Sequence, residues 1–197
     1  VDKNFPYHRD VYRDGTIQAS GPFVPDKLWF FGSLQYQRDW DSQPGTNPAL
    51  PTKNDSRRMF YKFNYEISSK HRLMHGYHND FYFIPDVSTS FTAPSTLALS
   101  HGDNPTPNVG YTGVLSDKTF VEARYSGFFL HSSVNPLQSG VPSVLARTED
   151  QDTGLITGGI TAWNENRSWK WGAAAKLSHV VDSFLGGSHD IKTGLQY

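Results

Sequence analysis

The chain has 197 residues, enough for one ordinary domain, and its formal net charge of −1 gives no basic surface that would favour nucleic acid. It has no cysteine, which excludes disulfide bonds and thiolate zinc sites. It also has no run of about 18 apolar residues, so no transmembrane helix is predicted. The composition and the lack of a long apolar run are compatible with a transmembrane β-barrel, because apolar and polar residues alternate along the strands of such a barrel and each strand is polar on average.

Apolar and polar residues alternate along most of the chain, and this period of two predicts β-strands. The predicted strands are, in chain order, 11–20, 28–40, 59–67, 72–82, 109–115, 119–130, 169–181 and a last one that begins at His189. The strand 28–40 is the clearest, and the residues that share its apolar face are Leu28, Phe30, Leu34 and Tyr36. A strand of this length is typical of a membrane-spanning barrel, whereas strands of about 5–6 residues are usual in soluble sandwiches.

The connections between these strands alternate between short and long. The short ones are 21–27, 68–71, 116–118 and 182–188, and the long ones are 41–55, 83–108 and 131–167, the last with a possible strand extension at 155–163. Outer-membrane barrels have short periplasmic turns and long extracellular loops. A β-sandwich with one solvated face would explain the alternation but not the loop asymmetry. The pattern therefore predicts an all-β fold, an antiparallel transmembrane β-barrel segment of about eight strands.

Three segments carry a resemblance to a known family. They are 21–31 (GPFVPDKLWFF), 64–73 (NYEISSKHRL) and 184–194 (FLGGSHDIKTG). In this order they resemble turn-and-strand motifs of TonB-dependent outer-membrane receptors, in particular the Oar-like group, which has an N-terminal carboxypeptidase-regulatory-like domain. The first motif departs from the family pattern at Gly21, which follows a serine instead of a second glycine, and at Pro25, where a lysine is usual.

The resemblance implies a barrel of about 22 strands with an N-terminal plug, in which transport is driven by the inner-membrane TonB complex. We expect residues 1–197 to be a fragment of that barrel, roughly a third of it, because the chain starts and stops inside patterned segments and has no recognisable plug, TonB box or signal peptide. Its expected partners are outer-membrane lipid, the TonB complex through the plug, and the remaining strands. The expected function is energised uptake of a bulky nutrient, such as a sugar, peptide or chelate.

Two other classes of function remain open. One is a soluble β-rich carbohydrate-binding module, and the other is a passive porin or adhesion barrel without a plug. Catalysis has no support, because the sequence contains no nucleophile elbow, no HExxH motif and no phosphate-binding glycine loop. We therefore expect no catalytic residue and no cofactor.

The nearest approach to a metal cluster is formed by His71, His75, His78 and Asp80. We expect no metal site there, because alternation places His75 and His78 on opposite faces of a strand. The acidic loop residues, Asp103 with Asn104 and Glu149, Asp150 and Asp152, lack the spacing of a calcium loop and are expected to form solvated turns.

Aromatic side chains near the long loops are the candidates for substrate binding, since they can stack on a sugar or a peptide. The candidates, together with one histidine, are Trp40, Tyr82, Phe83, His101 and Trp163. For Trp40 and Tyr82 we favour the alternative, a place in the aromatic girdle of the barrel. The side chains expected to face the barrel lumen, where a plug or water channel would lie, are Lys62, Glu66, Glu122 and Arg124.

Overall fold

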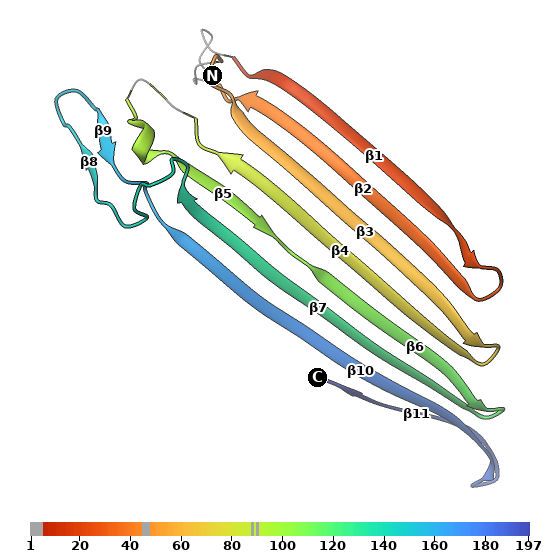
Figure 1. Ribbon diagram of the computed structural model, residues 1–197. Coiled ribbons are helices and arrows are strands. Elements are labelled where there is room, and N and C mark those ends of the chain that lie inside the picture. The colour runs from red at the N-terminus through yellow and green to blue at the C-terminus, as the bar shows by residue number, and fades with distance from the viewer. Residues whose placement is uncertain (1–5, 45–47, 88, 90) are drawn as a thin grey trace.

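A computed structural model describes residues 6–44, 48–87, 89 and 91–197. Almost all of this part forms a single broad antiparallel sheet of long strands that lie side by side (Figure 1). The elements are β1 (His8–Val24), β2 (Leu28–Ser42), β3 (Thr52–Ser68), β4 (His71–Pro85), η1 (Pro94–Thr96), β5 (Ala98–Asp103), β6 (Thr106–Ser116), β7 (Thr119–Pro136), β8 (Arg147–Glu149), β9 (Ile156–Gly158), β10 (Asn164–Phe184) and β11 (Gly187–Gln196). No helix in the described residues has the length and apolar character needed to cross a membrane.

Nearly every strand in the large sheet pairs with its neighbour in the chain. The strand order is β1-β2-β3-β4-β5-β7-β10-β11, and β6 continues the line of β5 between β4 and β7. Within the described residues β1 pairs only with β2, and β11 pairs only with β10, so each end of the sheet presents one unpaired edge. The small hairpin β8–β9 forms a separate two-stranded sheet.

The sheet has nine strands, one more than the eight that alternation predicts, because one strand position is divided. β5 lies inside the segment 83–108, which the sequence predicts to be a long connection. Asn104 and Pro105 interrupt the ladder between β5 and β6. The side chain of Asn79 accepts the backbone N–H of Asn104 at 2.9 Å, and the side chain of Asn104 accepts the backbone N–H of Asp80 at 2.8 Å. These bonds replace the missing ladder bonds at the break.

The strands extend further toward the long connections than the sequence predicts. β3 begins at Thr52 instead of residue 59, and β7 ends at Pro136 instead of residue 130. In these extensions both faces of the sheet carry polar side chains, so the alternation of apolar and polar residues that marks the rest of each strand is absent. The predicted long connections are therefore shorter in the structure, whereas the turns at the other end of the sheet stay short.

The two longest connections are tied to each other. The backbone N–H of Ala93 donates to the carbonyl of Ile156 at 2.9 Å, and the N–H of Ile156 donates to the carbonyl of Phe91 at 2.8 Å. Thr92 forms a parallel bridge with Ile156 of β9. Figure 1 shows η1 and the β8–β9 hairpin lying together at the same end of the sheet.

Almost no hydrophobic side chain is buried. Among the described residues only Ala98 and Ile160 form the buried hydrophobic set, while large apolar side chains such as Ile17 and Trp169 are 70% and 74% exposed. A soluble domain of this size normally buries an apolar core. Here the sheet is a single layer in the described part of the chain, and nothing within it covers either face.

Candidate functional site

The register of the strands assigns every strand residue to one of two faces. Directly opposed residues share a face, and Leu34 of β2 is opposed by Ile17 of β1 and Met59 of β3. Following this row and its neighbours from β1 to β11 gives one face that we call the apolar face and an opposite one that we call the polar face. The contrast between these two faces is the main structural feature of the sheet.

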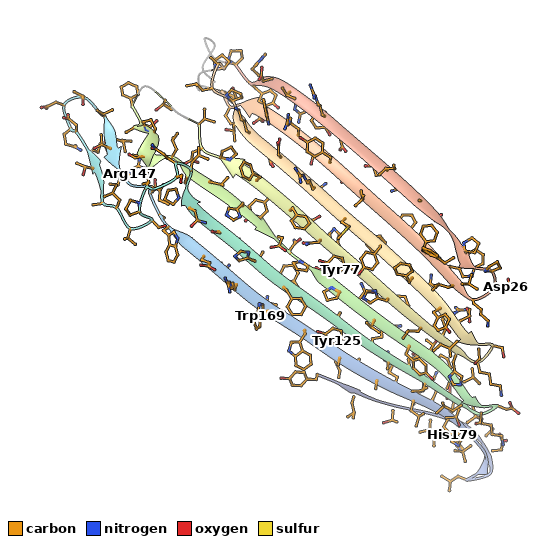
Figure 2. All side chains as sticks on the ribbon, in the orientation of Figure 1. Asp26, Tyr77, Tyr125, Arg147, Trp169 and His179 are labelled. Atoms are coloured by element: carbon orange, nitrogen blue, oxygen red, sulfur yellow. The ribbon has the colours of Figure 1, made fainter. Side chains whose placement is uncertain are left out.

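The apolar face carries no Asp, Glu, Lys or Arg over a band that crosses all eight strand positions. Its side chains come from Ile17, Ala19, Leu28, Phe30, Leu34, Tyr36, Met59, Tyr61, Phe63, Tyr65, Leu73, His75, Tyr77, Asn79, Phe81, Val109, Tyr111, Val121, Ala123, Tyr125, Phe129, Trp169, Trp171, Ala173, Ala175, Leu177, Ile191, Thr193, Leu195 and Tyr197. Tyr77, Tyr125 and Trp169 mark this band on three separate strands (Figure 2). Apart from His75, Asn79 and Thr193, the band is built from apolar and aromatic residues.

Charged residues on the same face bound the band on the side of the long connections. Arg57 of β3 lies between Tyr36 and Phe81 at this edge of the band, and one step further along the strands Arg38 of β2 is opposed by Asp55 of β3. On the same face, nearer β11, Asp103 of β5 is opposed by His131 of β7, which is itself opposed by Arg167 of β10. At the other end the band stops at the short turns. The band is therefore limited to one section of each strand.

The polar face carries a chain of hydrogen bonds and ion pairs across four adjacent strands. Gln35 donates to Asp14 at 2.9 Å and accepts from Arg58 at 3.1 Å. Arg58 lies 3.6 Å from Asp80, which in turn lies 3.0 Å from His78. A face with such a network is suited to water or to another protein segment.

The four residues that the sequence places toward a lumen all lie on this polar face. Lys62 is opposed by Phe31, and Glu66 accepts a hydrogen bond from Arg72 at 2.6 Å. Arg124 and Glu122 lie two positions apart on β7, with 3.6 Å between their charged atoms. The shared face of Lys62, Glu66, Glu122 and Arg124 agrees with the alternation of residues along each strand.

The structure brings together three of the five candidate binding residues. Phe83 is opposed by His101 on the apolar side of the sheet, beyond the charge-free band. The indole N–H of Trp163 donates to the side-chain oxygen of Asn135 at 3.0 Å, and the amide nitrogen of Asn135 lies 3.5 Å from Nε2 of His101. Asn135 therefore links Trp163 to His101.

The other two candidates lie elsewhere. Trp40 is on the same face but two strands away from Phe83, where its indole N–H donates to Asp55 at 3.1 Å. Tyr82 points to the opposite face, because it alternates with Phe83. Its hydroxyl packs over Gly102, at which an added Cβ would lie 2.9 Å from the Tyr82 oxygen.

Sequence reasoning missed Asn135, which joins Trp163 to His101, and a group of charged residues on the same face. His131 lies 3.7 Å from Asp103 and 3.8 Å from Glu165, and the side chain of Asn135 also donates to Ser133. All of these residues except Asp103 fall in the segment 131–167, which the sequence predicts to be a loop, so the sequence offers no strand pairing that would place them. A broad open hollow of about 1350 Å³ lies beside this group and extends along the apolar face to β1.

The histidines of β4 do not form a metal site. His75 lies on the apolar face, 5.6 Å from Tyr61 between ring centres, and His78 lies on the polar face, as alternation predicts. His71 is the first residue of β4, and its Nδ1 lies 2.7 Å from the hydroxyl of Tyr111. Across the described residues no group of three or more His, Cys, Asp or Glu side chains is placed to hold a metal ion.

The acidic turn near residue 150 is held by hydrogen bonds between its own residues. One carboxylate oxygen of Asp150 accepts the backbone N–H groups of Asp152 and Thr153 at 3.0 and 2.9 Å. Hydrogen bonds from Thr153 and then from Asp152 hold the pKa of Asp150 below its ordinary value. This carboxylate caps its own turn.

The chain matches no family model, no curated protein and no solved structure.

Proposed function

We propose that the chain is part of the wall of an outer-membrane β-barrel, of the TonB-dependent transporter type, in a Gram-negative envelope. The observation that carries the proposal is the charge-free apolar face that crosses all eight strand positions with no layer over it. In lipid such a face is buried by the acyl chains, and an antiparallel sheet satisfies its backbone groups between strands.

The height of the apolar face supports this proposal. On β2 the first charged residue of that face, Arg38, follows Leu28 by ten residues, or about 33 Å of extended strand. At the tilt of about 45° that is usual in membrane barrels, this length spans about 23 Å along the membrane normal. The apolar band of known outer-membrane barrels is about 25 Å tall.

Strand length also fits the proposal. β3 and β10 contain 17 and 21 residues, whereas about 9–11 residues suffice to cross the bilayer. The remaining residues would project past the membrane on the side of the long connections. That side would then be extracellular, and the short turns would be periplasmic.

The polar face would then line the lumen and contact the plug of the complete transporter. The ladder from Asp14 to Asp80 offers hydrogen-bond donors and acceptors to such a plug. The unpaired edges of β1 and β11 would pair with the remaining strands of the barrel, because an open edge is not tolerated in lipid.

Transport would begin at the extracellular end. There Tyr82, which lies on the polar face, would contact a bulky nutrient such as a sugar, peptide or chelate at the mouth of the lumen, whereas Phe83 and His101 would face the outside of the barrel. Plug movement driven by the TonB complex would then admit the nutrient. The energised step rests on the three sequence motifs that resemble the family. A passive porin or adhesion barrel would share the wall but would lack the plug.

The experiment is to express the full-length protein in a Gram-negative host and to assay its outer-membrane fraction for a heat-modifiable barrel. The expected result is a band that shifts on heating in detergent and is found in that fraction. A soluble, folded protein that needs no detergent would refute the membrane assignment and favour a soluble β-rich binding module. If the barrel forms, nutrient uptake that is independent of the TonB complex would favour the passive porin.

A further inference from the structure

The apolar face ends, on β1 to β3, in a group of cations that we call the cationic patch. It consists of Arg13 on β1, Arg38 on β2, and Lys53 and Arg57 on β3, with Asp55 as its one carboxylate. All five lie on the same face as Leu34 and Ile17, because they are opposed to one another or alternate with those residues. The patch has an excess of three positive charges.

Among the described residues, Arg38 is the one cation of the patch that forms an ion pair with a carboxylate. Arg38 donates to both oxygens of Asp55, at 2.9 and 2.8 Å. The guanidinium of Arg38 and the ammonium of Lys53 both lie over the indole of Trp40, at 4.7 and 4.8 Å from the ring centre. This arrangement holds the two cations in place without neutralising Lys53.

Arg13 is in an unfavourable position for an isolated protein. It lies directly opposite Arg38 across the β1–β2 ladder, and like charges in directly opposed positions destabilise a sheet. Neither Arg13 nor Arg57 has an ion pair within 4 Å in the part of the chain that the structure describes. An anion between these side chains would remove the repulsion.

An apolar hollow lies directly beside the patch. Its lining includes Leu34, Met59 and Phe81 of the apolar face and Arg57 and Asp55 of the patch, and on the side away from β1 it also includes His101, Asp103 and His131. The apolar part of the hollow is therefore the part near Leu34 and Met59. Gly15, which is opposed by Tyr36, would have open space around an added Cβ. Cations and an apolar hollow therefore meet at one level of the sheet.

We propose that the cationic patch binds the phosphate groups of a phosphorylated glycolipid in the outer leaflet, with acyl chains of the same molecule in the hollow. This inference rests on the proposed function, because it takes the apolar face to be in the membrane. The cationic patch at the end of that face would then lie at the level of the lipid head groups. Arginine and lysine both bind phosphate through charge-assisted hydrogen bonds.

The position of the patch favours a lipid over free phosphate. A free phosphate ion would need only the cations, whereas an amphipathic molecule uses the cations and the hollow together. The adjoining stretch of apolar side chains runs down β2 and β3 from the patch toward the short turns, so acyl chains attached to a phosphate group in the patch would contact apolar side chains.

The test uses the full-length protein, purified from outer membranes in mild detergent and stripped of lipid. Binding of lipid A, of dephosphorylated lipid A and of inorganic phosphate is measured by native mass spectrometry. The variant replaces the three cations of the patch that form no ion pair within the described residues, as Arg13→Gln, Lys53→Gln and Arg57→Gln. The matched control removes three cations from the polar face, as Lys170→Gln, Lys176→Gln and Lys192→Gln.

We expect the patch variant to bind lipid A roughly 100-fold more weakly, since each cation near a membrane surface contributes about a fivefold factor. The control should bind within about twofold of the unaltered protein. Equal binding of lipid A by both variants would overturn the inference.

Three further readings keep the test independent of the variants and of the proposed function. Equal binding of lipid A and its dephosphorylated form by the unaltered protein would overturn the inference even if the variant failed to assemble. Displacement of lipid A by millimolar inorganic phosphate would identify a plain phosphate site and would overturn it as well. Heat modifiability is recorded in parallel: its absence refutes the proposed function, whereas its presence with unchanged lipid binding refutes this inference alone.

Discussion

A charge placed on the apolar face should cost most at mid-height and little at either end. Leu34 follows Leu28 by six residues, about 20 Å along the strand and about 14 Å along the normal at 45°. This position lies near the middle of a band about 25 Å tall. Leu34 is 54% exposed, and no described part of the chain covers it.

We expect Leu34→Arg to destabilise the barrel by about 2–4 kcal/mol, which corresponds to roughly 30- to 1000-fold in the folding equilibrium. Leu28→Arg and Tyr36→Arg, on the same face near the two interfaces, should each cost about 0–1 kcal/mol. Ser33→Arg is the matched control, because Ser33 neighbours Leu34 but lies on the polar face. It should cost less than about 1 kcal/mol.

The assay is reversible urea unfolding of the full-length protein in lipid vesicles, followed by tryptophan fluorescence. The decisive result is the profile along β2, not the single value at Leu34. A soluble core would penalise arginine at all three positions of the apolar face, since burial there does not depend on height. Equal costs at Leu28, Leu34 and Tyr36, or equal costs at Leu34 and Ser33, would refute the reasoning.

Three other changes test separate features. Gly102→Ala should destabilise the protein by about 1–3 kcal/mol, because its Cβ would lie 2.5 Å from a backbone oxygen, whereas Gly15→Ala, with open space, should not; urea unfolding in vesicles compares the two. Asn79→Ala should cost about 1–3 kcal/mol in the same assay, because the 3% exposed side chain accepts a backbone amide at the break between β5 and β6. The backbone amides of the turn at Asp150 should exchange faster in acid. The pKa of the Asp150 carboxyl is lower in the folded than in the unfolded protein, so the stabilisation by this carboxylate is complete above the unfolded pKa and is lost as pH falls through the folded pKa. Hydrogen exchange of the Thr153 amide against pH measures this loss.

Each of these changes has a result that would contradict it. Equal stability of Gly102→Ala and Gly15→Ala would mean that the close approach at Gly102 relaxes without cost. Asn64→Ala serves as the control for Asn79, because Asn64 lies on the polar face opposite Trp29 and Met74, and an equal loss at both positions would deny a special role to the break. A pH profile of Thr153 exchange that is unchanged in Asp150→Ala would show that the carboxylate does not hold the turn.

The sequence predicts the strands best where one face is apolar. The faces predicted for β2 and β3 agree with the register that opposes Leu34 to Met59 and Phe30 to Phe63. Alternation is absent where both faces are polar, so the sequence predicts a loop up to residue 55, although β3 begins at Thr52. The strand β5 was missed for a related reason, because its break at Asn104 and Pro105 looks like a loop.

The binding candidates were harder to predict than the strands. Residue type alone selected Tyr82 and Phe83 together, but alternation within β4 directs them to opposite faces. The link from Trp163 to His101 depends on Asn135, which comes close only because β7 pairs with β5 and runs on to Pro136. Contacts of this kind depend on strand register far from the residues concerned, and a local pattern does not contain that information.

The hydrogen bonds between the two longest connections determine how these segments can be exchanged with those of a homologous protein. Because Ala93 and Phe91 share backbone hydrogen bonds with Ile156, the segments around η1 and β9 form one unit, although more than sixty residues of chain separate them. A chimera that takes one segment from a homologous protein and keeps the other would lose these bonds. Specificity at this end of the molecule should therefore be transferable only when both segments are moved as a pair.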